Sequence, residues 1–109
     1  MPKKPFEALS EPMFYILMAL SHGAMCGADI TAWIRQRTDE RVVLGPGTLY
    51  TILPKLTEAE LICQVELSGR KRSYTLTDKG YFLYNSECDR LRRCVADIEK
   101  AEPLYRKEA

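Results

Sequence analysis

The stretch from Leu44 to Gly80 constrains the fold more than any other part of this chain, because its hydrophobic period changes from helical to strand-like. In the first part, apolar residues recur at steps of three and four, which places them on one face of a helix. In the second part, residues 61–67 and 73–76 are rich in β-branched and apolar residues and predict two strands. The apolar residues of the helical part are Leu49, Ile52, Leu53 and Leu56.

Two parts of this stretch are expected to be exposed to solvent or to a partner: the other face of the helix and the turn between the strands. The helix face is small and polar, so it can enter a groove. The turn holds a glycine and three adjacent cations, which either keep the hairpin soluble or grip phosphates. Beside an exposed helix face, we favour phosphate contacts next to a helix in a major groove. The residues are Gly47, Thr48, Tyr50, Thr51, Pro54, Lys55 and Glu58 on the helix, and Arg70, Lys71 and Arg72 in the turn.

Pro54 conflicts with this helix, because a proline inside a helix removes a hydrogen bond and normally costs about 3 kcal/mol. Either the helix kinks on its exposed side, or it shortens to its first two turns. Residues 48–51 remain usable in both cases, since the N-terminal part of a recognition helix makes the base contacts.

The residues before Leu44 predict two more helices. The first, residues 11–20, follows Ser10 as N-cap and is apolar on nearly every side, so it must be covered all round. A chain of 109 residues has little core to spare. We therefore expect part of this helix, including Phe14 and Leu17, to face a second subunit. Residues 21–27 contain two glycines and predict a turn, and the second helix is expected from Ala28 to Thr38.

The C-terminal part predicts one long helix, which Thr77 caps and which runs to Glu102. Its apolar positions alternate in steps of three and four, as in a heptad seam. The seam can pack on its own domain or pair with a second copy, and the length of the helix favours pairing. The seam consists of Tyr81, Tyr84, Cys88, Leu91, Val95 and Ile98, and the expected dimer interface of Phe14, Leu17, Tyr84, Cys88, Leu91, Val95 and Ile98.

Helix, turn, helix and hairpin, in this order, predict a mainly α fold with a small β-hairpin: a winged helix-turn-helix over residues 1–76. A dimerisation helix and tail would occupy residues 77–109. The composition, 46% hydrophobic and 28% charged, is ordinary for a globular protein. The longest apolar run, residues 13–20, is too short to span a bilayer, and no signal-like segment opens the chain. We expect a soluble cytoplasmic protein.

Other functional classes have little support in the sequence. The four cysteines lack metal-ligand spacing, so we expect no metal or other cofactor. The sequence contains no recognisable pair of catalytic carboxylates, no nucleophile beside a base and no phosphate loop. We therefore expect no enzyme. The net charge of +1 counts mildly against nucleic acid, but the cations are concentrated in the hairpin turn.

Three motifs are spread over most of the chain: residues 44–50, LGPGTLY; residues 69–80, with the wing GRKRSY and the Leu-Thr-x-x-Gly that ends it; and residues 11–17 with His22-Gly23. Together they resemble the PadR-like transcriptional regulators. The resemblance implies a prokaryotic dimeric repressor of the short subfamily, with a winged helix and one C-terminal dimerisation helix. By position, Thr48, Tyr50 and Thr51 fall on the recognition helix, and Arg70, Lys71 and Arg72 on the wing.

The chain departs from the family pattern at Pro54 and Glu60, where a basic residue and a glycine are common. Some short members bind flat aromatic drugs against a tryptophan of the C-terminal helix. That helix has Phe82 and Tyr84 here, but no tryptophan.

We therefore expect a homodimer that binds double-stranded DNA at a near-palindromic operator, with its recognition helices about 34 Å apart. One alternative is a protein-interaction winged helix that no longer reads DNA, which Pro54, Glu58 and the low net charge favour. Another is a sensor that binds a small-molecule effector in an aromatic-lined cleft at the dimer interface. The expected DNA contacts are Thr48, Tyr50, Thr51, Lys55, Arg70, Lys71 and Arg72.

Overall fold

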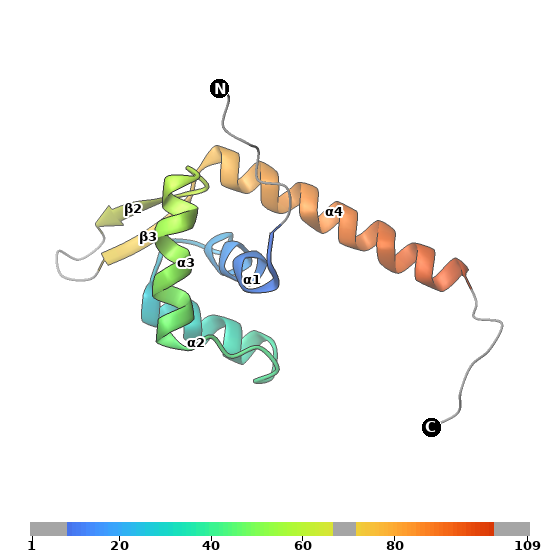
Figure 1. Ribbon diagram of the computed structural model, residues 1–109, viewed down its shortest axis with the longest axis horizontal. Helices are drawn as coiled ribbons and strands as arrows, with labels where there is room; N and C mark the ends of the chain where they lie inside the picture. Colours follow the sequence, from blue (N-terminus) through green and yellow to red (C-terminus); the bar gives the residue numbers. More distant parts are fainter. Residues whose placement is uncertain (1–8, 67–71, 102–109) are drawn as a thin grey trace.

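The structure is a computed structural model that describes residues 9–66 and 72–101. Over these ranges it contains four helices and a three-stranded antiparallel sheet (Figure 1). The elements, in chain order, are α1 (Glu11–Leu20), β1 (Met25–Cys26), α2 (Gly27–Arg37), α3 (Pro46–Glu58), β2 (Ile62–Glu66), β3 (Arg72–Leu76) and α4 (Asp78–Lys100). Three helices and the sheet are packed together, whereas α4 extends away from them. The predicted mainly α winged helix-turn-helix is confirmed.

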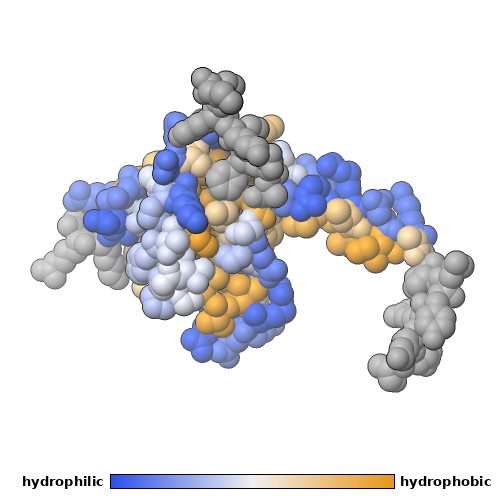
Figure 2. All heavy atoms as spheres, in the orientation of Figure 1, coloured by the Kyte–Doolittle hydropathy of each residue, from blue (hydrophilic) through white to orange (hydrophobic). Residues whose placement is uncertain are grey.

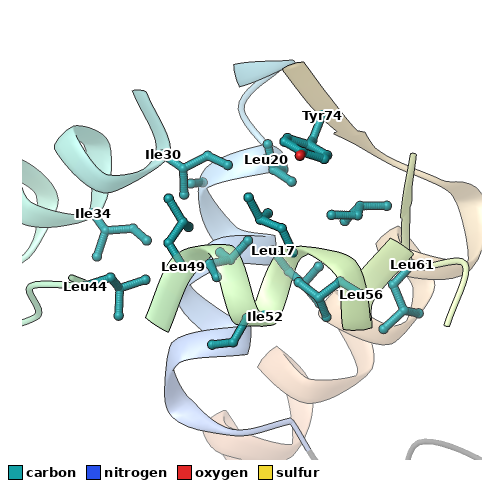
Figure 3. Packing of buried hydrophobic residues seen from close by; sticks show 14 of the residues in the cluster. Leu17, Leu20, Ile30, Ile34, Leu44, Leu49, Ile52, Leu56, Leu61 and Tyr74 are labelled. Atoms are coloured by element: carbon teal, nitrogen blue, oxygen red, sulfur yellow. The ribbon is translucent and has the colours of Figure 1, made fainter. Parts of the chain in front are cut away.

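A single hydrophobic core joins α1, α2, α3 and the sheet (Figure 3). All four apolar residues of the predicted α3 face are buried, so the helical period assigned this face correctly. They pack among Ile16 and Leu17 of α1, Ile30 and Ile34 of α2, and Leu61, Ile62 and Tyr74 at the sheet. Because α3 lies against this core along its whole length, its other face is held outward.

The expectation that Leu17 contacts a second subunit needs correction. Its side chain is fully buried among residues of its own chain and leaves no surface for a partner. Phe14, one turn earlier, is only half-buried and packs on Tyr84 of α4, with ring centroids 5.5 Å apart. A helix that is apolar all round gives no sign of which side its own domain covers.

The predicted turn at residues 21–27 contains a strand that the sequence analysis missed. Strand β1 pairs antiparallel with β3, with Met25 opposite Tyr74 and Cys26 opposite Ser73. The sheet order is β1-β3-β2, so the expected hairpin is part of a three-stranded sheet. Two residues are too few to produce a strand period.

Helix α3 continues through Pro54 to Glu58, so the shortened alternative is wrong. Pro54 lies on the exposed face, where water can satisfy the carbonyl that loses its donor. The helix ends at Glu58 with Ala59 as its C-cap, and the next residue, Glu60, has a φ of 63° in the left-handed region. The amide of Glu60 donates to the Thr57 carbonyl, and that of Leu61 to the Leu56 carbonyl, as in a Schellman motif. A glycine at this position would adopt this conformation without strain.

Helix α4 is fastened to the end of α3 at its first turn. The Thr77 hydroxyl accepts from the Gly80 amide at 3.0 Å and donates to the Glu60 carbonyl at 2.6 Å. Lys79 Nζ donates to the Ala59 carbonyl at 3.0 Å. Gly80 lies so close to Leu61 that an added Cβ would overlap the Leu61 carbonyl oxygen. This contact fixes the direction in which α4 leaves the domain.

The outer half of α4 is largely uncovered by the described residues. Every residue from Leu91 to Lys100 is exposed, including Val95 at 54% and Ile98 at 70%. Figure 2 shows hydrophobic surface along this part of the helix. With 23 residues, α4 is about 35 Å long at the usual helical rise. Within the described ranges, no helix is both long and apolar enough to cross a membrane.

Candidate nucleic-acid interface

The outward face of α3 presents the helix residues that the sequence predicts as contacts. Thr48, Thr51 and Lys55 are all exposed, opposite the buried leucines. The Thr51 hydroxyl donates to the Gly47 carbonyl at 2.7 Å, as threonines inside helices often do. Its oxygen can still accept a hydrogen bond from a partner. The face therefore offers short polar side chains that allow close approach.

Tyr50 is exposed at 58%, but its ring does not simply extend from α3. The hydroxyl end lies over Gly27, the first residue of α2, where an added Cβ would lie 2.6 Å from Tyr50 Oη. Beside the ring is an open groove of about 400 Å³ between α2 and α3, lined also by Thr31, Leu44 and Pro46. Gly27 is not among the predicted site residues, and its only signal in the sequence is a glycine at the start of a helix.

The β2–β3 hairpin lies beside α3 (Figure 1). Arg72, the first residue of β3, is exposed and pairs across the ladder with Glu66. Arg70 and Lys71, which the sequence predicts as phosphate contacts, lie outside the described residues. Of the three cations in the predicted turn, the structure therefore locates Arg72.

Arginines near the end of α2 make contacts within the chain. The Arg35 guanidinium donates to Glu40 Oε1 through two nitrogens, at 2.6 and 2.9 Å. Arg37 lies 5.0 Å from the Trp33 ring centroid, and its cation faces the ring. Arg41 donates to the Tyr15 hydroxyl at 2.7 Å. The contacts of Glu40 and Arg41 connect the loop that leads into α3 to α2 and α1.

The junction of α1 and α4 holds the inner residues of the expected dimer interface. Burial raises the pKa of Tyr84 to about 12, with a hydrogen bond to Cys88 as a second cause. The Arg90 guanidinium donates to both oxygens of Glu87 at 2.8 Å and lowers the pKa of that carboxyl. Cys88 is half-buried, whereas Leu91, Val95 and Ile98 are exposed, so the seam emerges gradually from the domain.

Other kinds of site have little support in this geometry. Over residues 9–66 and 72–101, no group of three histidine, cysteine or acidic side chains is placed to hold a metal ion. The cysteines are free thiols, of which Cys26 is buried, Cys88 half-buried, and Cys63 and Cys94 exposed.

Residues 16–84 match the family described as "Transcriptional regulator PadR-like family". An uncharacterized 37.1 kDa protein in transposon TN4556 of Streptomyces fradiae is 34% identical over 95 residues, which cover 86% of this chain. The match covers only 27% of that relative.

Two solved structures are similar in sequence as well as fold. A transcriptional regulator from Clostridium thermocellum is 27% identical, with a TM-score of 0.70, over 83% of this chain and 91% of its own. Bacillus subtilis PadR, solved in complex with operator DNA, is 28% identical, with a TM-score of 0.62, over 69% of this chain and 45% of its own.

Proposed function

This chain belongs to the PadR-like family of transcriptional regulators, and we propose that it represses transcription as a homodimer bound to a near-palindromic operator in double-stranded DNA. The observation that carries the proposal is the division of α3 into a buried apolar face and an exposed face with Thr48, Thr51 and Lys55. The relative from Bacillus subtilis, which binds operator DNA, supports it. We assign residues 1–76 to DNA binding and residues 77–109 to dimerisation.

Within this proposal, the two threonines contact base edges and the longer side chains contact the DNA backbone. Thr48 and Thr51 are short enough for α3 to lie deep in a major groove, where a threonine can bond to several bases. Cationic and phenolic side chains can bind phosphates. Such contacts fix the register of the protein on the duplex without reading its sequence. The proposed phosphate contacts are Tyr50, Lys55, Arg70, Lys71 and Arg72.

Dimerisation is proposed because the outer half of α4 extends beyond its own domain. Most of a helix's stability in a protein comes from tertiary packing of its apolar face, and this part exposes Leu91, Val95 and Ile98 in a row. A second copy that covers the row would bury apolar surface, which favours association. A twofold arrangement would place two α3 helices in successive major grooves, about 34 Å apart. Phe14, Tyr84 and Cys88 would form the inner edge of this interface.

A small-molecule effector is a further proposed partner. The groove between α1 and α4, about 350 Å³, is lined by the aromatic rings of Phe14 and Tyr15 and by Arg41, Glu87 and Arg90. It lies where α4 meets the DNA-binding domain, so a ligand there would act on the angle between the two.

The test is DNA binding measured over a salt series, with the DNA upstream of the protein's own gene as first probe. Replacement of Arg70, Lys71 and Arg72 by alanine should weaken binding to every sequence. It should also reduce the slope of log K against log salt by about 0.9 for each phosphate that the protein no longer neutralises. Thr48→Ala with Thr51→Ala should instead reduce discrimination between sequences and leave the slope unchanged.

Arg93→Ala with Lys100→Ala is a matched control, because both cations are exposed on α4 and away from its apolar seam. This variant should bind as the wild type does. An unchanged slope in the hairpin variant would exclude those cations as phosphate contacts. Wild-type protein that binds a protein partner, insensitively to salt, and no operator would favour the protein-interaction alternative.

A further inference from the structure

The hydroxyl end of the Tyr50 ring packs directly on Gly27. A Cβ added at Gly27 would lie 2.6 Å from Tyr50 Oη, 3.1 Å from Cζ and 3.2 Å from Cε1. Carbon atoms of side chains hardly ever come within 3.0 Å of such neighbours. The ring can therefore occupy this position only because Gly27 has no side chain.

The backbone conformation does not require this glycine. Gly27 is the first residue of α2, and the left-handed conformation occurs at a different glycine, Gly23, with a φ of 133°. Within helices glycine is disfavoured relative to alanine, because it loses more backbone freedom on folding. The contact with Tyr50 is thus the structural reason for a glycine here.

The contact between Gly27 and Tyr50 also contributes little to the hydrophobic core. Tyr50 remains 58% exposed, and the open groove beside it leaves the ring room to turn away. The ring is exposed and lies on the face that carries Thr48 and Thr51, so a partner at this face can contact it. In helix-turn-helix proteins, the helix before the recognition helix crosses the DNA backbone. The Tyr50 hydroxyl lies at the start of that helix.

We propose that Gly27 is a positioning residue for DNA binding, which lets the Tyr50 ring lie across from α3 to the start of α2 and directs its hydroxyl to a backbone phosphate. The inference rests on the proposed function and deepens it. Tyr50 donates the hydrogen bond, and Gly27 acts only through Tyr50. One such contact forms in each subunit of the dimer.

The experiment compares Gly27→Ala, Tyr50→Phe, Tyr50→Ala and Gly27→Ala with Tyr50→Ala, in the full chain. Operator binding by fluorescence anisotropy is measured over a salt series. Gly27→Ala and Tyr50→Phe should each weaken binding about tenfold or more, because each removes a hydrogen bond to a charged phosphate. Neither should change the salt slope, because the phenol is uncharged and its loss alters no counterion release. Added to Tyr50→Ala, Gly27→Ala should have no further effect.

Thermal unfolding shows whether Gly27→Ala remains folded, which we expect because the atom that must move is the exposed end of a side chain. Wild-type affinity in Gly27→Ala or in Tyr50→Phe would overturn the inference and leave the proposed function intact. An equal reduction in affinity from Gly27→Ala with and without Tyr50→Ala would also overturn it, since the added methyl would then act directly. Wild-type protein that binds no operator would overturn both.

Discussion

Helices α3 and α4 carry similar apolar stripes, but only one of them is covered by its own chain. On α3, Leu49, Leu53 and Leu56 are at most 2% exposed. On α4, Leu91, Val95 and Ile98 are exposed at 37%, 54% and 70%. The comparison teaches that a periodic sequence predicts an apolar face, whereas the neighbours of the helix decide what covers it.

The neighbours differ because of position in the fold. The apolar face of α3 is covered by α1, α2 and the sheet, whereas α4 meets α1 and the sheet with its first turns and then leaves them (Figure 1). The same kind of stripe therefore stabilises a single chain in one helix and, as we propose, a pair of chains in the other.

Leucine-to-alanine substitutions should give the largest difference in stability between the α3 stripe and the α4 stripe. Leu53→Ala should reduce the free energy of unfolding by about 2–5 kcal/mol, because it leaves a cavity in a packed core. Leu91→Ala should cost less, and its cost should depend on protein concentration. Urea denaturation at two widely separated concentrations measures both. Equal, concentration-independent reductions would break the comparison.

A second prediction concerns the joint between the two helices. Gly80→Ala should destabilise the protein by about 3 kcal/mol, because the new methyl group overlaps the Leu61 carbonyl. Gly47→Ala in α3 is the matched control, since nothing lies within 4 Å of its added Cβ. The control should be neutral or stabilising in thermal unfolding. A tolerated Gly80→Ala would mean that α4 can leave the domain in another direction.

A third prediction concerns the exposed stripe on α4, where charged substitutions test the proposed dimer. Val95→Asp with Ile98→Asp should weaken the proposed dimer at least tenfold, because two apolar side chains become charged at the contact. The mass of the particle measured by sedimentation should fall toward that of one chain at micromolar concentration. Ala96→Asp is the control, because it adds a charge next to the seam and not in it. A double variant with the wild-type mass would place the dimer interface elsewhere.

The smallest effect is expected at the end of α3. Glu60→Gly should stabilise the protein by about 0.5–1 kcal/mol, because glycine adopts the left-handed conformation without the strain that a side chain adds there. Glu58→Gly, at the last residue of the same helix, should instead destabilise the protein by up to about 1 kcal/mol, because glycine is a poor helix former. Thermal melts of both variants compare the signs. Destabilisation in both would show that the Glu60 side chain makes a contact worth more than the strain.

The sequence predicted most of the fold because its main signals are local. The α3 face, the N-caps Ser10 and Thr77, and the length of α4 all follow from spacings within one segment. What failed depended on contacts between segments or on very short ones. Because α1 is apolar on every side, the sequence does not distinguish the buried Leu17 from an interface residue, and the two residues of β1 are too few to have a period.

For the candidate site, the exposure of Thr48, Thr51 and Lys55 was predictable, because it is the complement of the buried face. The role of Gly27 was not, since Gly27 and Tyr50 are separated in the sequence and meet only after α2 and α3 have packed. The DNA-binding roles of all these residues remain predictions.

Strand β1 has a mechanical consequence. It is bonded to β3 of the hairpin and leads directly into Gly27, so a shift of the hairpin pulls on the start of α2. If the hairpin and the start of α2 both contact the DNA backbone, β1 holds these two contacts at a fixed distance from each other. Among duplexes with equal base contacts, the protein would discriminate by the spacing of their backbones, which varies with local groove width.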